Sequence, residues 1–321
     1  MNYNIRFRRQ SWKDCYVANF MGMVVDKIIE KYPEHSFEIL RDISQENNGY
    51  GSISSPLNFS LLNPENGKYI VVSAIDNWKN HLMKHLGWEP EKMVKMFYSG
   101  GFSFLEYFSL PQKWKVSHDI RNIYRPFYYG PYDHRHQDLI TELYNNRNPS
   151  STDLVFRGLL FPFRQSVAKH IEDPDIKVVC RRSGGTNLEY TDYLRELSEH
   201  TAALSLPGAT EICNRDIECF AVGTPVLRPL IHTQYPDPLV PDYHYVNFYL
   251  DCYYSDTGNP GYKHIEDFGK YLSAKWNQIK KNTEFLKFVS ENARAWYLKN
   301  CQIENNVNYL VSQIRLEDIN G

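Results

Sequence analysis

An arginine and a glutamate three residues apart, Arg215 and Glu218, lie in the segment LSLPGATEICNRDIECFAVGTPVLRP at residues 204–229. The segment reads as an apolar strand, a Pro-Gly turn and a helix that ends at Gly223. Residues three apart share one helix face. An arginine in the first helical turn opposes the helix dipole, but it can contact a phosphate through two N–H groups, and a neighbouring carboxylate can accept both hydroxyls of a ribose. The spacing alone leaves an ordinary surface ion pair, worth about 0.3 kcal/mol, as the alternative.

Strands and helices alternate around this segment. Strands are expected at 152–158, 176–182, 202–208 and 224–230, and helices at 163–173, 189–201 and 213–223. This alternation predicts a doubly wound α/β domain, in which ligands bind beyond the carboxyl ends of the strands and at helix N-termini. Pro207 and Gly208 stand at such an end, where a glycine lets the backbone come close to a phosphate.

The N-terminal half shows a similar pattern. Helical spacing of apolar residues and short β-branched runs predict helices at 11–32 and 134–147 and strands at 69–75, 92–102 and 113–120. This predicts a second α/β domain with a mainly parallel sheet. The polar stretch 145–152, which contains Pro149, is the expected linker. The region from Ile265 to about Leu316 is helical in pattern.

The composition fits a protein of two globular domains. The chain has 321 residues and a formal net charge of -2, which gives no basic face for nucleic acid. No apolar run approaches the ~18 residues of a membrane span. The N-terminus lacks the apolar run of a signal peptide, and the six cysteines have no zinc spacing, so we expect free thiols and a cytoplasmic location.

The stretch from Asp153 to Pro225 resembles the donor-binding domain of GT-B glycosyltransferases, in particular that of the exostosin-type family. The matching residues are Phe156-Arg157-Gly158, Arg164, Tyr190, Leu194, Leu197-Ser198, Arg215, Glu218, Gly223 and Thr224-Pro225-Val226. Leu206-Pro207-Gly208 departs from the pattern, because the family usually has one more residue between proline and glycine. Residues 1–150 match no family that we recognise.

The resemblance implies two Rossmann-like domains facing a central cleft. It implies an enzyme that transfers a sugar from a nucleoside-diphosphate sugar, most commonly a UDP-sugar, to a hydroxyl of a glycan acceptor. The acceptor-binding domain would span 1–148 and the donor-binding domain 149–283, with helices at 284–321 that can cross back to the first domain. GT-B enzymes need no metal, because the helix dipole and cationic side chains neutralise the leaving diphosphate.

The same resemblance assigns roles to individual residues. Arg164 and Arg215 would hold the donor diphosphate, and Glu218 would bind a ribose or sugar hydroxyl. Arg182 and Arg157 could line the nucleotide pocket or be solvated side chains at strand ends. The expected donor-site residues are Arg157, Gly158, Arg164, Arg182, Pro207, Gly208, Asn214, Arg215 and Glu218.

An inverting transfer, which we expect, needs a general base for the acceptor hydroxyl. Asp76 follows a buried strand and is the first candidate, although it could equally cap the next helix. His118 and Asp119 are second candidates. A retaining mechanism would not need this base. Asp173 and Asp175 have the spacing of a metal motif but fall in a predicted turn, so we expect no metal.

Two other functions stay open. An epimerase or hydrolase would share the nucleotide-sugar site, and a non-catalytic carbohydrate-binding protein on the same fold would bind glycan without turning over a nucleotide sugar. The pair Arg215 and Glu218 favours an active donor site, whereas the shortened turn at Pro207 argues against a standard one. The segment RPFYYGPYDHRH at 125–136 could be an acceptor-binding loop or simply an ordered aromatic loop.

Overall fold

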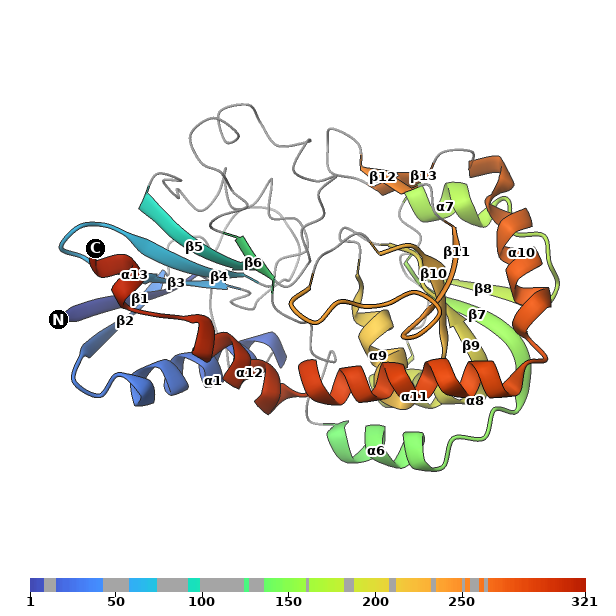
Figure 1. Cartoon of the computed structure of the whole chain (residues 1–321), viewed down its shortest axis with the longest axis horizontal. Coiled ribbons are helices and arrows are strands. Elements are labelled where there is room, and N and C mark those ends of the chain that lie inside the picture. Colours follow the sequence, from blue (N-terminus) through green and yellow to red (C-terminus); the bar gives the residue numbers. More distant parts are fainter. Residues whose placement is uncertain are drawn as a thin grey trace. The chain divides into compact units, whose positions relative to one another are not determined.

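The computed structural model shows two compact units, each with its own sheet and helices (Figure 1). The structure describes residues 1–8, 16–42, 58–73, 92–98, 124–126, 136–159, 162–181, 188–207, 212–231, 235–249, 252–254, 260–262 and 265–321. The described residues of 1–126 and 303–321 form the first unit, and those of 136–302 form the second. Two α/β units with parallel-rich sheets confirm the predicted fold class at this level.

The first unit contains a six-stranded sheet in the order β2-β1-β3-β4-β5-β6. Its strands are β1 (Asn2–Arg8), β2 (Ser36–Asp42), β3 (Asn58–Leu62), β4 (Tyr69–Ser73), β5 (Met93–Tyr98) and β6 (Tyr124–Pro126). Strand β3 runs antiparallel to both of its neighbours and the other pairs are parallel. The sequence did not predict β1, β2 and β3. Strand β2 lies at the edge with Glu38 and Ile39 exposed, so no continuous apolar run marks it.

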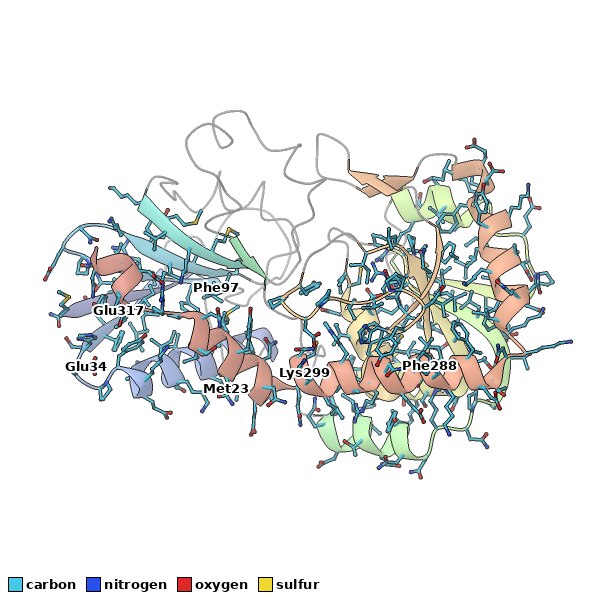
Figure 2. The ribbon with its side chains drawn as sticks, in the orientation of Figure 1. Met23, Glu34, Phe97, Phe288, Lys299 and Glu317 are labelled. Atoms are coloured by element: carbon cyan, nitrogen blue, oxygen red, sulfur yellow. The ribbon has the colours of Figure 1, made fainter. Side chains whose placement is uncertain are left out.

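Helix α1 (Tyr16–Lys31) packs on this sheet together with the C-terminal helices α12 (Ile303–Gln313) and α13 (Glu317–Asn320). Phe97 on β5 is buried in the core that the sheet shares with these helices, and Met23 on α1 packs against this core (Figure 2). Lys31 at the end of α1 donates 2.9 Å hydrogen bonds to the carbonyl oxygens of Val311 and Ile314. The last helices of the chain therefore complete the core of the first unit.

The second unit contains a five-stranded, fully parallel sheet in the order β11-β10-β9-β7-β8. Its strands are β7 (Ser151–Leu159), β8 (Ile176–Arg181), β9 (His200–Leu204), β10 (Val226–Pro229) and β11 (Val246–Tyr249). A small antiparallel pair, β12 (Cys252–Tyr254) and β13 (Pro260–Tyr262), belongs to the same part of the chain. The parallel sheet confirms the predicted doubly wound arrangement, because its central strands are the apolar runs that sequence reasoning identified.

The helices of the second unit form two groups (Figure 1). The first group, α6 (Gln137–Asn145), α8 (Tyr190–Glu199) and α11 (Thr283–Asn300), packs around α9 (Asn214–Val222). The second group is α7 (Pro162–Ala168), a 3₁₀ turn at Ile265–Asp267 and α10 (Phe268–Ile279). Helices α6 and α11 both pack on α9. The second unit therefore extends on both sides of the predicted limits, to α6 before residue 148 and to α11 after residue 283.

Two local expectations can be compared with the structure. Asp173 accepts a 3.0 Å hydrogen bond from the backbone N–H of Asp175, which confirms a turn before β8. Helix α8 occupies Tyr190–Glu199 of the predicted range 189–201, with Glu189 at its cap position. Among the described helices, none is long and apolar enough to cross a bilayer.

Candidate functional site

The candidate site lies where β7 and β9 end and α9 begins. After β9 the chain stays buried through Ser205, Leu206 and Pro207, and α9 starts at Asn214. This is the carboxyl edge of a parallel sheet beside a helix N-terminus, the position where open α/β folds bind ligands. The sequence predicted this location.

Two arginines make cation–π contacts with the ring of Phe156. The guanidinium carbon of Arg215 lies 4.4 Å from the ring centroid, and that of Arg164 lies 5.6 Å from it. Phe156 is fully buried, while Arg215 and Arg164 are only 8% and 5% exposed. A desolvated cation–π contact is worth up to about 2 kcal/mol. The apolar strand β7 therefore carries a platform that keeps two positive charges in the interior.

Arg215 is the less satisfied of these two arginines. Its Nη2 donates to the backbone carbonyl of Arg157, whereas Nε and Nη1 are buried and have no hydrogen-bond partner among the described residues. A Cβ at Gly158 would overlap Arg215 Nη2, so the glycine makes room for the guanidinium. Buried charged donors without acceptors are costly, so in native proteins such groups are met by an ordered water, an ion or a ligand.

Arg164 donates its hydrogen bonds to backbone carbonyl groups of the segment that follows β9. Its Nε donates to the carbonyl of Pro207 at 3.0 Å, and Nη2 donates to that of Leu206 at 2.7 Å and contacts Cys213 Sγ at 3.2 Å. Through these bonds α7 fixes the segment that leaves β9. The structure thus brings Arg164 to the predicted place, with the role of holding the turn.

The carboxyl of Glu218 is buried between two helices. It is 4% exposed, and its Oε2 accepts a 3.1 Å hydrogen bond from the hydroxyl of Tyr193 on α8. Burial raises the pKa of Glu218 from 4.5 to about 7, although hydrogen bonds from Tyr193 and Tyr190 and the charge of Arg215 act in the opposite direction. Near neutral pH this carboxyl can therefore accept or release a proton.

Replacing Glu218 with glutamine is expected to remove the contribution that titration of this carboxyl makes to the free energy of unfolding. The raised pKa means that the protonated folded form is favoured, so this part is complete below pH 4.5 and is lost as pH rises to about 7. The free energy of unfolding of the parent should therefore fall relative to Glu218→Gln across this window. Urea unfolding at a series of pH values measures the difference, and a difference independent of pH would contradict the assignment.

Two buried groups fix the start of α9. Asp216 is fully buried and forms a 2.8 Å ion pair with Arg228 Nη1 of β10, which is also buried. The other oxygen of Asp216 accepts a 2.7 Å hydrogen bond from the backbone N–H of Cys213, the N-cap residue. Cys213 and Asp216 thus form a capping box, which stabilises the start of α9. The far end of α9 is held by α11, where Ser290 donates to the carbonyl of Gly223 at 2.5 Å.

The remaining expected residues separate into two sets. Arg157 forms an ion pair with Glu196 of α8, with Nη2 donating at 2.6 Å, and Asn214 is the first, half-buried residue of α9. Five predicted residues lie outside the described part of the chain: Asp76, His118, Asp119, Arg182 and Gly208. Their roles stay predictions.

Sequence reasoning missed how deeply this site is buried. The surface ion pair that the spacing left open for Arg215 and Glu218 is wrong, because every residue of α9 from Arg215 to Val222 is buried. Sequence reasoning also gave no role to Tyr193. The available signal was its place three residues after Tyr190, which puts both hydroxyls on one face of α8.

Comparisons with known proteins add distant likenesses. No family model matches the chain, and no curated protein matches it in sequence. The chain is similar to a glycosyltransferase from Rickettsia africae, with 11% identity and a TM-score of 0.44 over 91% of this chain and 80% of that one. It is similar to HepE of Anabaena, solved with UDP-glucose, with 8% identity and a TM-score of 0.45 over 97% and 98%.

A third similar structure is WaaG, a glycosyltransferase of lipopolysaccharide biosynthesis, with 8% identity and a TM-score of 0.38 over 96% of this chain and 98% of that one. Likenesses at this distance do not identify the family or the activity of this chain. The exostosin-type resemblance therefore stays a prediction, and function has to be argued from the site.

Proposed function

We propose that this protein is a glycosyltransferase that moves a sugar from a nucleoside-diphosphate sugar to a hydroxyl of a glycan acceptor. The observation that carries the proposal is the Arg215 guanidinium. It is buried at the carboxyl edge of a parallel sheet, with Nε and Nη1 unpartnered among the described residues. A diphosphate supplies oxygen acceptors in the geometry that a guanidinium fork binds.

The surroundings of Arg215 suit the rest of such a donor. Helix α9 has nine residues and starts beside the end of β9, so its first N–H groups add positive potential for an anion. The Glu218 carboxyl, one turn further on, is an acceptor for ribose or sugar hydroxyls. Resemblance of the motifs favours a UDP-sugar. In this proposal Arg215, with Arg164 nearby, stabilises the leaving diphosphate without a metal ion.

The acceptor side of the proposal rests on sequence alone. Asp76 remains the first candidate for the general base of an inverting transfer, with His118 and Asp119 next. A purely glycan-binding protein has no need of a buried arginine at this edge, so the site favours a nucleotide ligand. An epimerase or hydrolase would use the same donor site.

A thermal-shift screen against UDP, GDP, ADP, CMP and their sugars, with and without EDTA, tests the proposal. A ligand at a hundred times its dissociation constant adds about 2.7 kcal/mol to stability, and we expect this for one nucleotide, unchanged by EDTA. Incubation with the matching nucleotide sugar, with and without oligosaccharide acceptors, then separates transfer from hydrolysis or epimerisation. No stabilisation by any nucleotide would refute the donor site.

Replacing Gly158 with alanine is expected to weaken binding of the nucleotide sugar about tenfold. The new methyl group would occupy the place of Arg215 Nη2 and displace the guanidinium, and a lost hydrogen bond to a charged group is worth about 1.5–3 kcal/mol. Isothermal titration calorimetry measures the affinity. As a control, the same substitution in an Arg215→Met background should have little further effect, because Gly158 acts through Arg215. A full tenfold loss in that background would contradict this reasoning.

A further inference from the structure

Two tyrosines of α8 surround the Glu218 carboxyl. Tyr193 donates to Oε2 at 3.1 Å, and Tyr190, one turn earlier, also acts to lower the pKa of Glu218. The two tyrosine rings lie 6.2 Å apart, and the ring of His136 lies 5.6 Å from that of Tyr190. The resemblance assigns no function to Tyr193.

Tyr193 acts as a donor throughout the ordinary pH range. Desolvation and the neighbouring Glu218 carboxylate raise the pKa of its hydroxyl well above the ordinary value, so it keeps its proton. A carboxylate has about four acceptor positions. With the tyrosine hydroxyls as donors, acceptor capacity remains for hydroxyl groups of a ligand.

We propose that Tyr193 is a positioning residue of the nucleotide-sugar site, whose hydroxyl holds the Glu218 carboxyl in one orientation for the hydroxyl groups of the ligand. This inference rests on the proposed function. A glutamate side chain has three rotatable bonds, and fixing it before the ligand arrives removes an entropic cost from binding. Tyr193 itself need not touch the ligand.

The groups that act on Glu218 are known for each helix around it. Helix α8 contributes Tyr190 and Tyr193, and α9 itself contributes Arg215 and Asp216. Helices α6 and α11 also pack on α9, and the charged side chains described for them act near its C-terminal half.

On this C-terminal half, Arg294 of α11 donates to the carbonyl of Ala221, and Arg147, which follows α6, acts on Cys219. Tyr193 is therefore a hydroxyl donor on a neighbouring element that a single substitution can remove without changing the formal charge around Glu218.

A hydrogen bond to the ionised Glu218 carboxylate lowers the pKa of that group, whatever else the bond does. A bond that served only the packing of α8 would affect stability and shift this titration, but it would leave ligand affinity unchanged at a pH where the carboxylate is ionised. Tyr193→Phe removes only the hydroxyl, so the two roles are separated by following the protonation of Glu218 together with the affinity for the ligand.

The first readout needs no ligand. Infrared spectroscopy of the parent, with Glu218→Gln as reference, identifies the protonated carboxyl band of Glu218 and its midpoint, expected at about pH 7. In Tyr193→Phe the midpoint should move to higher pH. An unchanged midpoint would overturn the proposal.

The second readout is the affinity for UDP-glucose between about pH 6 and pH 9 by calorimetry. The diphosphate of this probe is a diester and keeps its charge over that range. Affinity of the parent should fall as Glu218 gains its proton, because protonation removes the negative charge and turns one acceptor position into an O–H donor. In Tyr193→Phe this fall should begin at higher pH, with affinity about tenfold lower at pH 8.

Tyr32→Phe is the matched control. Tyr32 donates a 3.0 Å hydrogen bond to the carbonyl of Ile314 in the first unit, so its substitution removes a comparable hydroxyl far along the chain from Glu218. It should leave the pH profile unchanged, and binding by Tyr193→Phe with the profile of this control would also overturn the proposal. If the parent binds no UDP-glucose at any pH, the UDP-sugar part of the proposed function is wrong, and the infrared midpoint still decides whether Tyr193 controls Glu218.

Discussion

Replacing Asp216 with alanine is expected to lower the free energy of unfolding by about 3–5 kcal/mol, because it leaves a buried charge without its partner. Arg228 is fully buried on β10, and Asp216 is the carboxylate that pairs with it at 2.8 Å. The substitution also removes the acceptor for the backbone N–H of Cys213, and loss of such a helix cap costs about 1 kcal/mol.

Urea unfolding of the parent and the variant measures this loss. Asp192 provides a matched control, since it forms a 3.1 Å ion pair with Arg195 on the exposed face of α8, and Asp192→Ala should change stability by no more than about 0.5 kcal/mol. Combining Asp216→Leu with Arg228→Met should recover much of the loss, because apolar residues can replace a buried pair. A loss below about 1 kcal/mol for Asp216→Ala would show that the pair does not hold α9.

Replacing Arg215 with methionine is expected to weaken binding of the nucleotide sugar at least a hundredfold, since removing one partner of a buried charge contact costs about 2–5 kcal/mol. Methionine keeps an unbranched apolar stem beside Phe156 and removes the guanidinium. Because Arg215 is buried, alanine would leave a cavity and confuse loss of binding with loss of stability. Titration calorimetry with the nucleotide found in the screen measures the affinity.

Arg195→Met is the control for this second substitution. Arg195 is an exposed arginine of the same unit, paired only with Asp192 among the described contacts, so its loss should leave affinity unchanged. Circular dichroism of each variant checks that the unit is folded. If Arg215→Met bound the ligand as well as the parent does, the buried guanidinium would have a purely structural role and the donor site would lie elsewhere.

The features that the sequence could predict are those with a local signal. Strands β7, β8 and β9 are short apolar runs between turn residues, and α9 ends at Gly223 in the left-handed conformation that glycine adopts readily. Order along the chain then placed Arg215 and Glu218 at the end of β9, because helices in such folds start where the preceding strand finishes.

What the sequence could not predict depends on contacts between distant elements. Arg228 follows an apolar run in β10, and only the packed fold shows that its partner is Asp216 of α9. The same holds for Tyr193, whose hydroxyl meets Glu218 across two helices. Arg215 lies against Phe156 and Gly158 of β7, while α6, α8 and α11 pack around α9 as a whole, and a nine-residue pattern does not contain that information.

Helix α9 is enclosed along nearly its whole length, and this limits how the protein can evolve. In most α/β proteins ligand residues lie on loops that vary while the scaffold stays unchanged. Here eight of the nine residues of α9 are buried in the second unit, and Arg215 and Glu218, the proposed ligand residues, are among them. A mutation that repacks the interior also moves these two side chains, and a mutation that changes them also disturbs the interior. If they bind the donor as proposed, change in donor preference should come mostly from residues outside α9, while α9 itself should change slowly.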